Sequence, residues 1–177
     1  MIVAIDPEKR KFLFKCACCG EIHEGGPSFS TDKPPAFFGI PEDERNDRIK
    51  INSDLCVIDG EEFWISATLS VPILGTDDTF LWGVWVTQSK ESFDRYVETY
   101  ETDQSGDGSF GWLMVSLPGY TRDDQPMISL PVDVFWGPER PEVRIHDDQD
   151  HPLAIDQREG ISWERAVELV TFVLHPN

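Results

Sequence analysis

The sequence has no run of apolar residues long enough to cross a membrane. A membrane-spanning helix needs about 18 or more apolar residues in a row, and no stretch of these 177 residues approaches that length. Residues 1–7 also lack the basic region and long apolar core of a signal peptide. We therefore expect a cytoplasmic protein that makes no contact with a membrane.

Positive charge is scarce in this chain. It has 15 Lys and Arg residues against 33 Asp and Glu residues, which gives a formal net charge of -18. A surface of this kind repels nucleic acid and anionic lipid and attracts basic proteins. Solubility alone is the other explanation, although a net charge of roughly 2 to 8 in magnitude is enough for a small domain. The charge excludes nucleic acid as a partner and predicts a basic protein partner.

Complete catalytic signatures are missing as well. The chain contains no Ser-His-Asp arrangement, no glycine-rich phosphate loop and no HExxH motif. Cysteine is rare, with four residues, and in a cytoplasmic protein we expect them as thiols or metal ligands rather than disulfides. A chain of this length buries enough surface to fold without covalent staples. The cysteines are therefore the first residues to consider for chemistry.

Three of the four cysteines lie in the segment CACCGEIH, residues 16–23. Cys16 and Cys19 form a CxxC motif, and His23 follows four residues later. Zinc takes four tetrahedral ligands from thiolates and imidazoles, and a CxxC turn directs two sulfur atoms to one point. Gly20 suits the tight turn after the second cysteine. The spacing predicts a zinc knuckle with Cys16, Cys19 and His23 as ligands.

The fourth zinc ligand must come from elsewhere in the chain. Cys56 is the first choice, because it lies in an extended segment beside a hairpin signal. His151 is the second choice, and Cys18 is an alternative to Cys19. A complete set of protein ligands predicts a closed, structural site.

Two other interpretations of the knuckle stay open. A water molecule in place of Cys56 would leave the open position that zinc catalysis needs, with Glu21 or Glu24 as general base. The cysteines can also be ordinary thiols with no metal. A thioredoxin-like redox pair is less favoured, because Gly20 and the Gly-Pro-Ser segment after it oppose a helix at the motif.

The pattern of apolar residues predicts an α+β fold. Residues 1–11 form a lead-in, and residues 12–177 form one domain that includes the knuckle. Strict alternation predicts two long strands at 61–74 and 79–87, joined to other elements by turns such as Asp59-Gly60. The order of elements favours a largely antiparallel sheet packed by two or three helices. Further strands are expected at 12–15, 110–117, 128–134 and 141–145, and helices at 41–48, 89–100 and 162–174.

Three segments have a less regular pattern. Residues 24–41 are rich in glycine, proline and serine and predict a long loop. Pro131 interrupts its strand and indicates an edge or a bulge. Residues 146–151 predict an acidic loop in which Asp150 caps the turn at His151-Pro152; the alternative is a metal or acid/base site made of His146, Asp148, Asp150 and His151.

Four tryptophans lie in or next to predicted strands. Packing in the core under the helices is the favoured role for them, and a binding platform on one face of the sheet is the alternative. These residues are Trp64, Trp82, Trp85 and Trp112.

Several motifs together resemble an uncharacterised bacterial family called domain of unknown function 2199. The matching segments cover nearly the whole chain from residue 12, so the resemblance implies one intact domain of that family. It implies no activity, because none is assigned to the family. The segments are Cys16-xx-Cys19-Gly20-Glu21-x-His23, SDLCVID at 53–59, WGVWV at 82–86, FGWL at 110–113, and DHPLA at 150–154 followed by Gln157, Gly160 and Ile161.

The first functional hypothesis is a non-enzymatic, acidic binding protein with a structural zinc. A concrete form is an immunity-type inhibitor that covers a basic toxin, such as a nuclease, through complementary charge. The second hypothesis is a metal-dependent, hydrolase-like enzyme that uses the open form of the zinc site. A third is a regulatory or scaffolding domain whose partner binds the tryptophan-bearing face.

Overall fold

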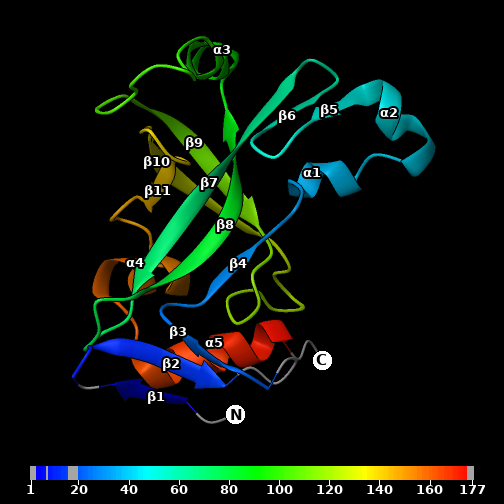
Figure 1. Ribbon diagram of the computed structural model, residues 1–177. Coiled ribbons are helices and arrows are strands. Elements are labelled where there is room, and N and C mark those ends of the chain that lie inside the picture. The colour runs from blue at the N-terminus through cyan, green and yellow to red at the C-terminus, as the bar shows by residue number, and fades with distance from the viewer. Residues whose placement is uncertain (1–2, 7, 16–19, 175–177) are drawn as a thin grey trace.

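The centre of the molecule is a closed β-barrel of five strands (Figure 1). The computed structural model describes residues 3–6, 8–15 and 20–174. Each barrel strand pairs with the next, and the last strand returns to the first. The strands are β7 (Glu62–Pro72), β8 (Thr79–Gln88), β9 (Gly108–Val115), β10 (Ile128–Phe135) and β11 (Glu142–Ile145).

The barrel closes through one parallel pair of strands. The pairs β7–β8, β8–β9, β9–β10 and β10–β11 are antiparallel. Strand β11 then pairs in parallel with β7 at Glu142 and Thr68, where the Thr68 amide donates to the Pro141 carbonyl at 2.7 Å. The prediction of a largely antiparallel sheet is confirmed, but the closure into a barrel was not predicted.

Alternate side chains of all five strands fill the barrel. Period-two alternation places one set of residues inside and the other set on the outer wall. The inner set forms one continuous core with the helices, and includes Ile65, Ala67, Leu69, Val71, Phe80, Trp82, Val84, Val86, Leu113, Val115, Ile128, Leu130, Val132, Val134, Val143 and Ile145.

Helices cover both ends of the barrel (Figure 1). Helix α3 (Lys90–Glu98) lies at one end, and α4 (Pro152–Glu159) and α5 (Trp163–Leu174) lie toward the other. Ser89 caps α3 by accepting from the Ser92 amide at 3.1 Å, and Ser162 accepts from the Arg165 amide at 3.2 Å. Both helices were predicted, at 89–100 and 162–174. None of the helices within the described ranges is long and apolar enough to span a membrane.

Short elements extend the barrel wall on either side of β7 and β8. Strand β4 (Ser28–Ser30) pairs in parallel with β8, and the hairpin of β5 (Ile49–Ile51) and β6 (Leu55–Ile58) pairs with the start of β7. Asp59 and Gly60 have φ angles of 54° and 72°, in a turn closed by Glu61 N and Ile58 O at 3.0 Å. This confirms the predicted hairpin turn. Between β4 and β5 lie α1 (Pro35–Phe38), the 3-10 helix η1 (Glu42–Glu44) and α2 (Arg45–Arg48).

A separate three-stranded antiparallel sheet lies beyond the α4 and α5 end of the barrel (Figure 1). It contains β1 (Val3–Asp6), β2 (Lys11–Lys15) and β3 (Ile22–Glu24). Strand β1 lies within residues 1–11, which were predicted as a lead-in. Asp78 joins this sheet to the β7–β8 turn: its carboxylate accepts from the Phe12 amide at 2.7 Å and from Lys11 Nζ at 2.9 Å.

Two local predictions were wrong. Pro131 lies in an interior strand, opposite Trp112 of β9. Its carbonyl accepts from the amide of His146, which lies just past the end of β11, at 3.1 Å. The N–H that proline lacks would point to the same side, where the pairing of β10 with β11 ends. The segment after residue 150 is a helix rather than a turn, and its cap is His151 Nδ1, which accepts from the Leu153 amide at 3.2 Å.

The predicted loop at 24–41 also contains structure. Strand β4 and helix α1 both lie in it. Three residues are too few for a periodic signal in the sequence, and β4 owes its extended form to its pairing with β8.

Candidate functional site

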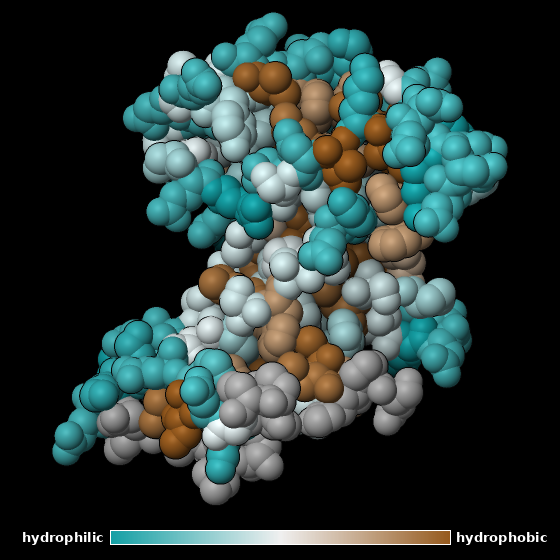
Figure 2. Space-filling view, turned by 45° about the vertical axis from the view of Figure 1, so that its right-hand side comes forward, coloured by the Kyte–Doolittle hydropathy of each residue, from teal (hydrophilic) through white to brown (hydrophobic). Residues whose placement is uncertain are grey.

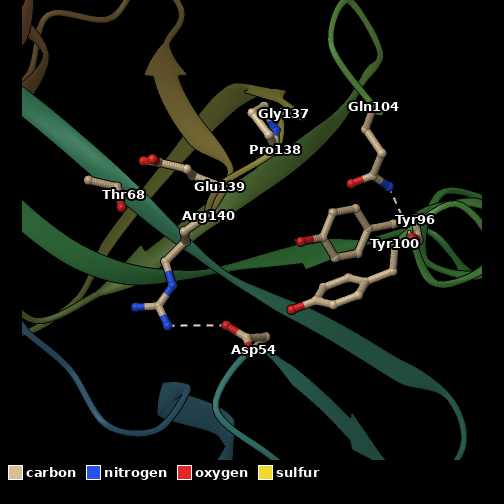
Figure 3. A pocket seen from close by; sticks show the side chains of 9 residues that line it. All are labelled: Asp54, Thr68, Tyr96, Tyr100, Gln104, Gly137, Pro138, Glu139 and Arg140. Carbon is tan, nitrogen blue, oxygen red and sulfur yellow. Dashed lines mark hydrogen bonds and ion pairs between the residues drawn. The ribbon is translucent and has the colours of Figure 1, made fainter. Parts of the chain in front are cut away.

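A polar cavity of about 470 Å³ opens at the α3 end of the barrel (Figure 3). Four parts of the chain form it: the segment before β6, the middle of β7, helix α3 with the residues after it, and the connection from β10 to β11. Its lining residues are Asp54, Thr68, Tyr96, Tyr100, Gln104, Gly137, Pro138, Glu139 and Arg140.

The Asp54 carboxylate accepts hydrogen bonds from two side chains at the cavity. It accepts from Arg140 Nη2 at 3.1 Å and from the Ser53 hydroxyl at 2.5 Å. The Asn52 side chain fixes the turn by accepting from the amides of Asp54 and Leu55. The Ser53 hydrogen bond lowers the pKa of Asp54 below its usual value, burial opposes it, and Arg140 adds to it. The surroundings of Asp54 therefore favour its charged form.

Two tyrosines form the wall opposite Arg140. Tyr96 and Tyr100 are one helical turn apart, and their rings meet edge to face with centroids 5.7 Å apart. Tyr96 is buried, which raises its pKa to about 12, whereas Tyr100 is half exposed. Both hydroxyl groups point into the space beside Asp54 (Figure 3). The pair presents one fixed and one accessible aromatic ring.

Gln104 contributes a buried amide to the same cavity. Its side chain is only 4% exposed, and its Nε2 donates to the Tyr96 carbonyl at 3.1 Å and to Thr99 Oγ1 at 2.7 Å. The Tyr96 carbonyl can only accept, so the atom facing it must be the nitrogen. The amide oxygen is then directed to the cavity side (Figure 3), and no group in the described part of the chain donates to it.

A second hollow of about 420 Å³ continues from the first. Both share Asp54 and Tyr100, and the second adds Glu98, Glu101 and Val97 among its lining residues. We call the two together the acidic hollow. Its charged lining consists of the carboxylates Asp54, Glu98, Glu101 and Glu139 and the guanidinium of Arg140. Hydrophilic residues also dominate the face of the molecule in Figure 2, where apolar residues form only small patches.

The sequence of the chain matches a known protein family. Residues 15–161 match the family described as an uncharacterized protein conserved in bacteria (DUF2199). The chain belongs to this family. The match confirms the resemblance found from the motifs, and it spans the whole barrel and every residue of the acidic hollow. Searches of curated proteins and of solved structures found no match.

The predicted knuckle, residues 16–23, lies at the start of this family match. Cys16, Cys18 and Cys19 fall outside the described residues. His23 is in β3, where its ring stacks on Phe14 of β2 with centroids 5.1 Å apart. Within the described ranges, no group of three or more His, Cys, Asp or Glu residues is placed to hold a metal ion. Zinc at the knuckle stays a prediction.

The structure does not bring Cys56 and His23 together. Cys56 is fully buried in β6, where it pairs with Trp64 of β7 in a small core that packs against Phe37 of α1, and burial raises its pKa to about 11. Strand β3 lies at the opposite end of the molecule (Figure 1).

The histidines of the 146–151 segment have separate roles. His151 is partly buried at the start of α4, and burial lowers its pKa. His146 Nε2 lies 3.3 Å from Asp133 Oδ1, and its ring packs near Phe110. His151 keeps a structural partner in the Leu153 amide.

Three of the four tryptophans pack in the core, as favoured from the sequence. Trp64, Trp82 and Trp85 are each 2% exposed. Trp112 is 44% exposed on the outer wall of β9, where its ring meets Phe110 edge to face.

Sequence reasoning missed the cavity. Tyr96 and Tyr100 lie within the helix predicted at 89–100, and no motif marked either of them or Arg140 as part of a site. Arg140 and Asp54 are 86 positions apart, so only the barrel brings them together. The one local signal was the SDLCVID motif, which contains Asp54.

Proposed function

We propose that this chain is a cytoplasmic, non-enzymatic binding protein whose acidic hollow receives a basic protein. The observation that carries this proposal is the concave surface around the half-exposed Tyr100, with four carboxylates against one arginine. Such a surface suits an immunity-type inhibitor of a basic toxin.

Charge and shape contribute to binding in different ways. The net charge of -18 increases the rate of encounter with a basic partner and slows encounter with an acidic one. Tyr100 supplies an aromatic anchor at the centre of the hollow, which is where the strongest contacts of an interface cluster. The hydrogen bond from Ser53 and the ion pair with Arg140 stabilise the negative charge of Asp54 and lower its pKa.

Photo-crosslinking tests this function. A crosslinking amino acid at position 100 should capture a basic protein, and the same group at Trp163 of α5 should not.

The variant Glu98→Gln, Glu101→Gln, Glu139→Gln should then slow association with the captured protein about tenfold. A matched variant with the same change in charge is Asp123→Asn, Asp124→Asn, Glu164→Gln, at exposed positions outside the hollow. Capture of acidic proteins, or equal slowing by both variants, would overturn the proposal.

We also propose that the knuckle binds zinc through Cys16, Cys19 and His23. Strands β2 and β3 pair at Lys15 and Ile22, so the cysteines lie in the connection of one hairpin, and a bound metal would stabilise that connection. His151 is the candidate for the fourth ligand, since Cys56 lies in β6 away from His23, and Cys18 is the alternative to Cys19. Elemental analysis should find one zinc per chain in the protein and in Cys56→Ser, and none in Cys16→Ser. Zinc lost from Cys56→Ser or missing from the unaltered protein would refute this set.

A metal-dependent, hydrolase-like enzyme is the second candidate function. The placement of Cys56 away from His23 favours it, because a site with three protein ligands leaves a position for water. Glu21 or Glu24 would then act as general base. A spectroscopic count of protein ligands on a cobalt-substituted sample separates the two: four ligands favour the structural role, and three with one water favour the enzyme.

A further inference from the structure

We infer that the cavity around Asp54 binds an arginine side chain of the basic partner, in competition with Arg140. This inference rests on the proposed function and specifies the chemistry of its central contact. It follows from the unpaired acceptor on Gln104, the single contact between Arg140 and Asp54, and the two tyrosine rings.

The cavity presents hydrogen-bond acceptors that the protein leaves incompletely used. No group in the described part of the chain donates to the amide oxygen of Gln104, although this side chain is 4% exposed. This oxygen keeps an open lone pair on the cavity side (Figure 3), so a ligand with N–H groups gains a hydrogen bond by reaching it. Asp54 supplies an ionised acceptor in the same cavity.

A guanidinium suits these acceptors better than an ammonium group. It is planar and carries five N–H donors in a fixed fork, so it can contact acceptors that lie apart. It also stacks on aromatic rings, and Tyr100 offers a half-exposed ring beside Asp54. A lysine ammonium is a compact, strongly hydrated charge that cannot span the cavity in this way.

Arg140 already makes the kind of guanidinium–carboxylate contact with Asp54 that we infer for the partner's arginine. Its guanidinium reaches Asp54 through one hydrogen bond of 3.1 Å, not through a two-point fork, and its side chain is 41% exposed. A single, partly exposed ion pair of this kind contributes little to stability. An arriving arginine can therefore replace Arg140 at Asp54 at small cost.

This competition makes an unusual prediction about two neighbouring residues. Removing the acceptor with Asp54→Asn should weaken binding of an arginine side chain about tenfold or more, the range for a charged hydrogen bond. Removing the competitor with Arg140→Gln should strengthen binding several-fold. If the ion pair had only a structural role, both changes would weaken binding.

The experiment is an NMR titration of the isotope-labelled protein with Nα-acetyl-arginine amide. The probe should shift the side-chain amide of Gln104 and the Nε signal of Arg140, and the corresponding citrulline compound, which has the same shape without charge, should not. Asp123→Asn is the control variant and should bind as the unaltered protein does. Backbone spectra of each variant check that the fold is intact.

Two results would overturn the inference. One is equal binding of the arginine and citrulline probes, and the other is weaker binding by Arg140→Gln. Failure of the proposed function gives a different result: the arginine probe binds as expected, but crosslinking from position 100 captures no basic protein. If crosslinking succeeds and the probe does not bind, the function stands and the arginine contact is wrong.

Discussion

At the scale of single residues, Asp78 carries the connection between the N-terminal sheet and the barrel. Its side chain is 8% exposed, and its two oxygens accept from Lys11 Nζ and from the backbone amide of Phe12. Phe12 itself is fully buried in the main core. One carboxylate therefore holds strand β2 where its aromatic residue can pack.

Replacing this carboxylate should destabilise the protein. We expect Asp78→Asn to lower the free energy of unfolding by about 1.5 to 3 kcal/mol, because the charged acceptor is lost and the amide NH2 of asparagine cannot accept from one of the two donors, Lys11 Nζ and the Phe12 amide. Urea unfolding measures the change. The neighbouring Asp77, whose side chain is 63% exposed and pairs with Arg10, is the control. Asp77→Asn should change stability by less than about 0.5 kcal/mol, and equal effects of the two variants would contradict this role.

The lowered pKa of Asp54 should make its contribution to the free energy of unfolding depend on pH. Its pKa is lowered in the folded protein, first by the hydrogen bond from Ser53, so its stabilising contribution is present at neutral pH. That contribution is lost as the pH falls through the folded-state pKa. The difference in unfolding free energy between the protein and Asp54→Asn should therefore shrink in acid, as measured by urea unfolding at a series of pH values.

The same effect has a direct NMR measurement. Ser53→Ala should raise the pKa of the Asp54 carboxyl toward its usual value, because the largest cause of the shift is removed. A carboxyl titration at or above the usual value in the unaltered protein would contradict the structure of this site.

At the scale of elements, β8 and β9 come very close to each other at Gly111. A Cβ atom added to Gly111 would lie 2.4 Å from the Thr87 carbonyl oxygen, and the Trp112 amide donates to Thr87 Oγ1 at 3.0 Å. Only glycine allows β9 to cross β8 this closely.

Gly111→Ala should therefore force the two strands apart. We expect a loss of about 1 to 3 kcal/mol in unfolding free energy, the usual cost of overpacking, with faster hydrogen exchange of the Trp112 amide. Gly137→Ala is the matched control, since a Cβ there would contact nothing within 4 Å. A Gly111→Ala variant as stable as Gly137→Ala would show that the strands can separate at no cost.

At the scale of the whole molecule, the charge of -18 should make salt act in opposite directions on folding and on binding. Salt screens the repulsion among carboxylates of the folded state, so the melting temperature should rise with ionic strength. Screening also weakens attraction to a basic partner, so association should slow. Calorimetry and stopped-flow measurements over the same salt series check this, and sodium and potassium chloride should give equal results. Melting that is insensitive to salt would exclude surface repulsion as a significant force.

The sequence by itself determined the elements whose signals are local. Alternation along Ile65 to Val71 and Phe80 to Val86 predicts β7 and β8, because a strand places every second residue on one face. Serine caps and apolar stripes predict α3 and α5, and Asp59-Gly60 predicts a turn, because each depends on neighbours within a few positions. The same local motifs were enough to recognise the family.

Only the tertiary structure decided the barrel and the acidic hollow. Strand closure depends on the pairing of Thr68 with Glu142, and the cavity depends on Asp54 meeting Arg140. These partners are far apart in the chain and carry no periodic signal, because their contact follows from how the packed strands curve and close. Local forces therefore set which segments are strands and helices, and the long-range packing of the barrel set which side chains share a site.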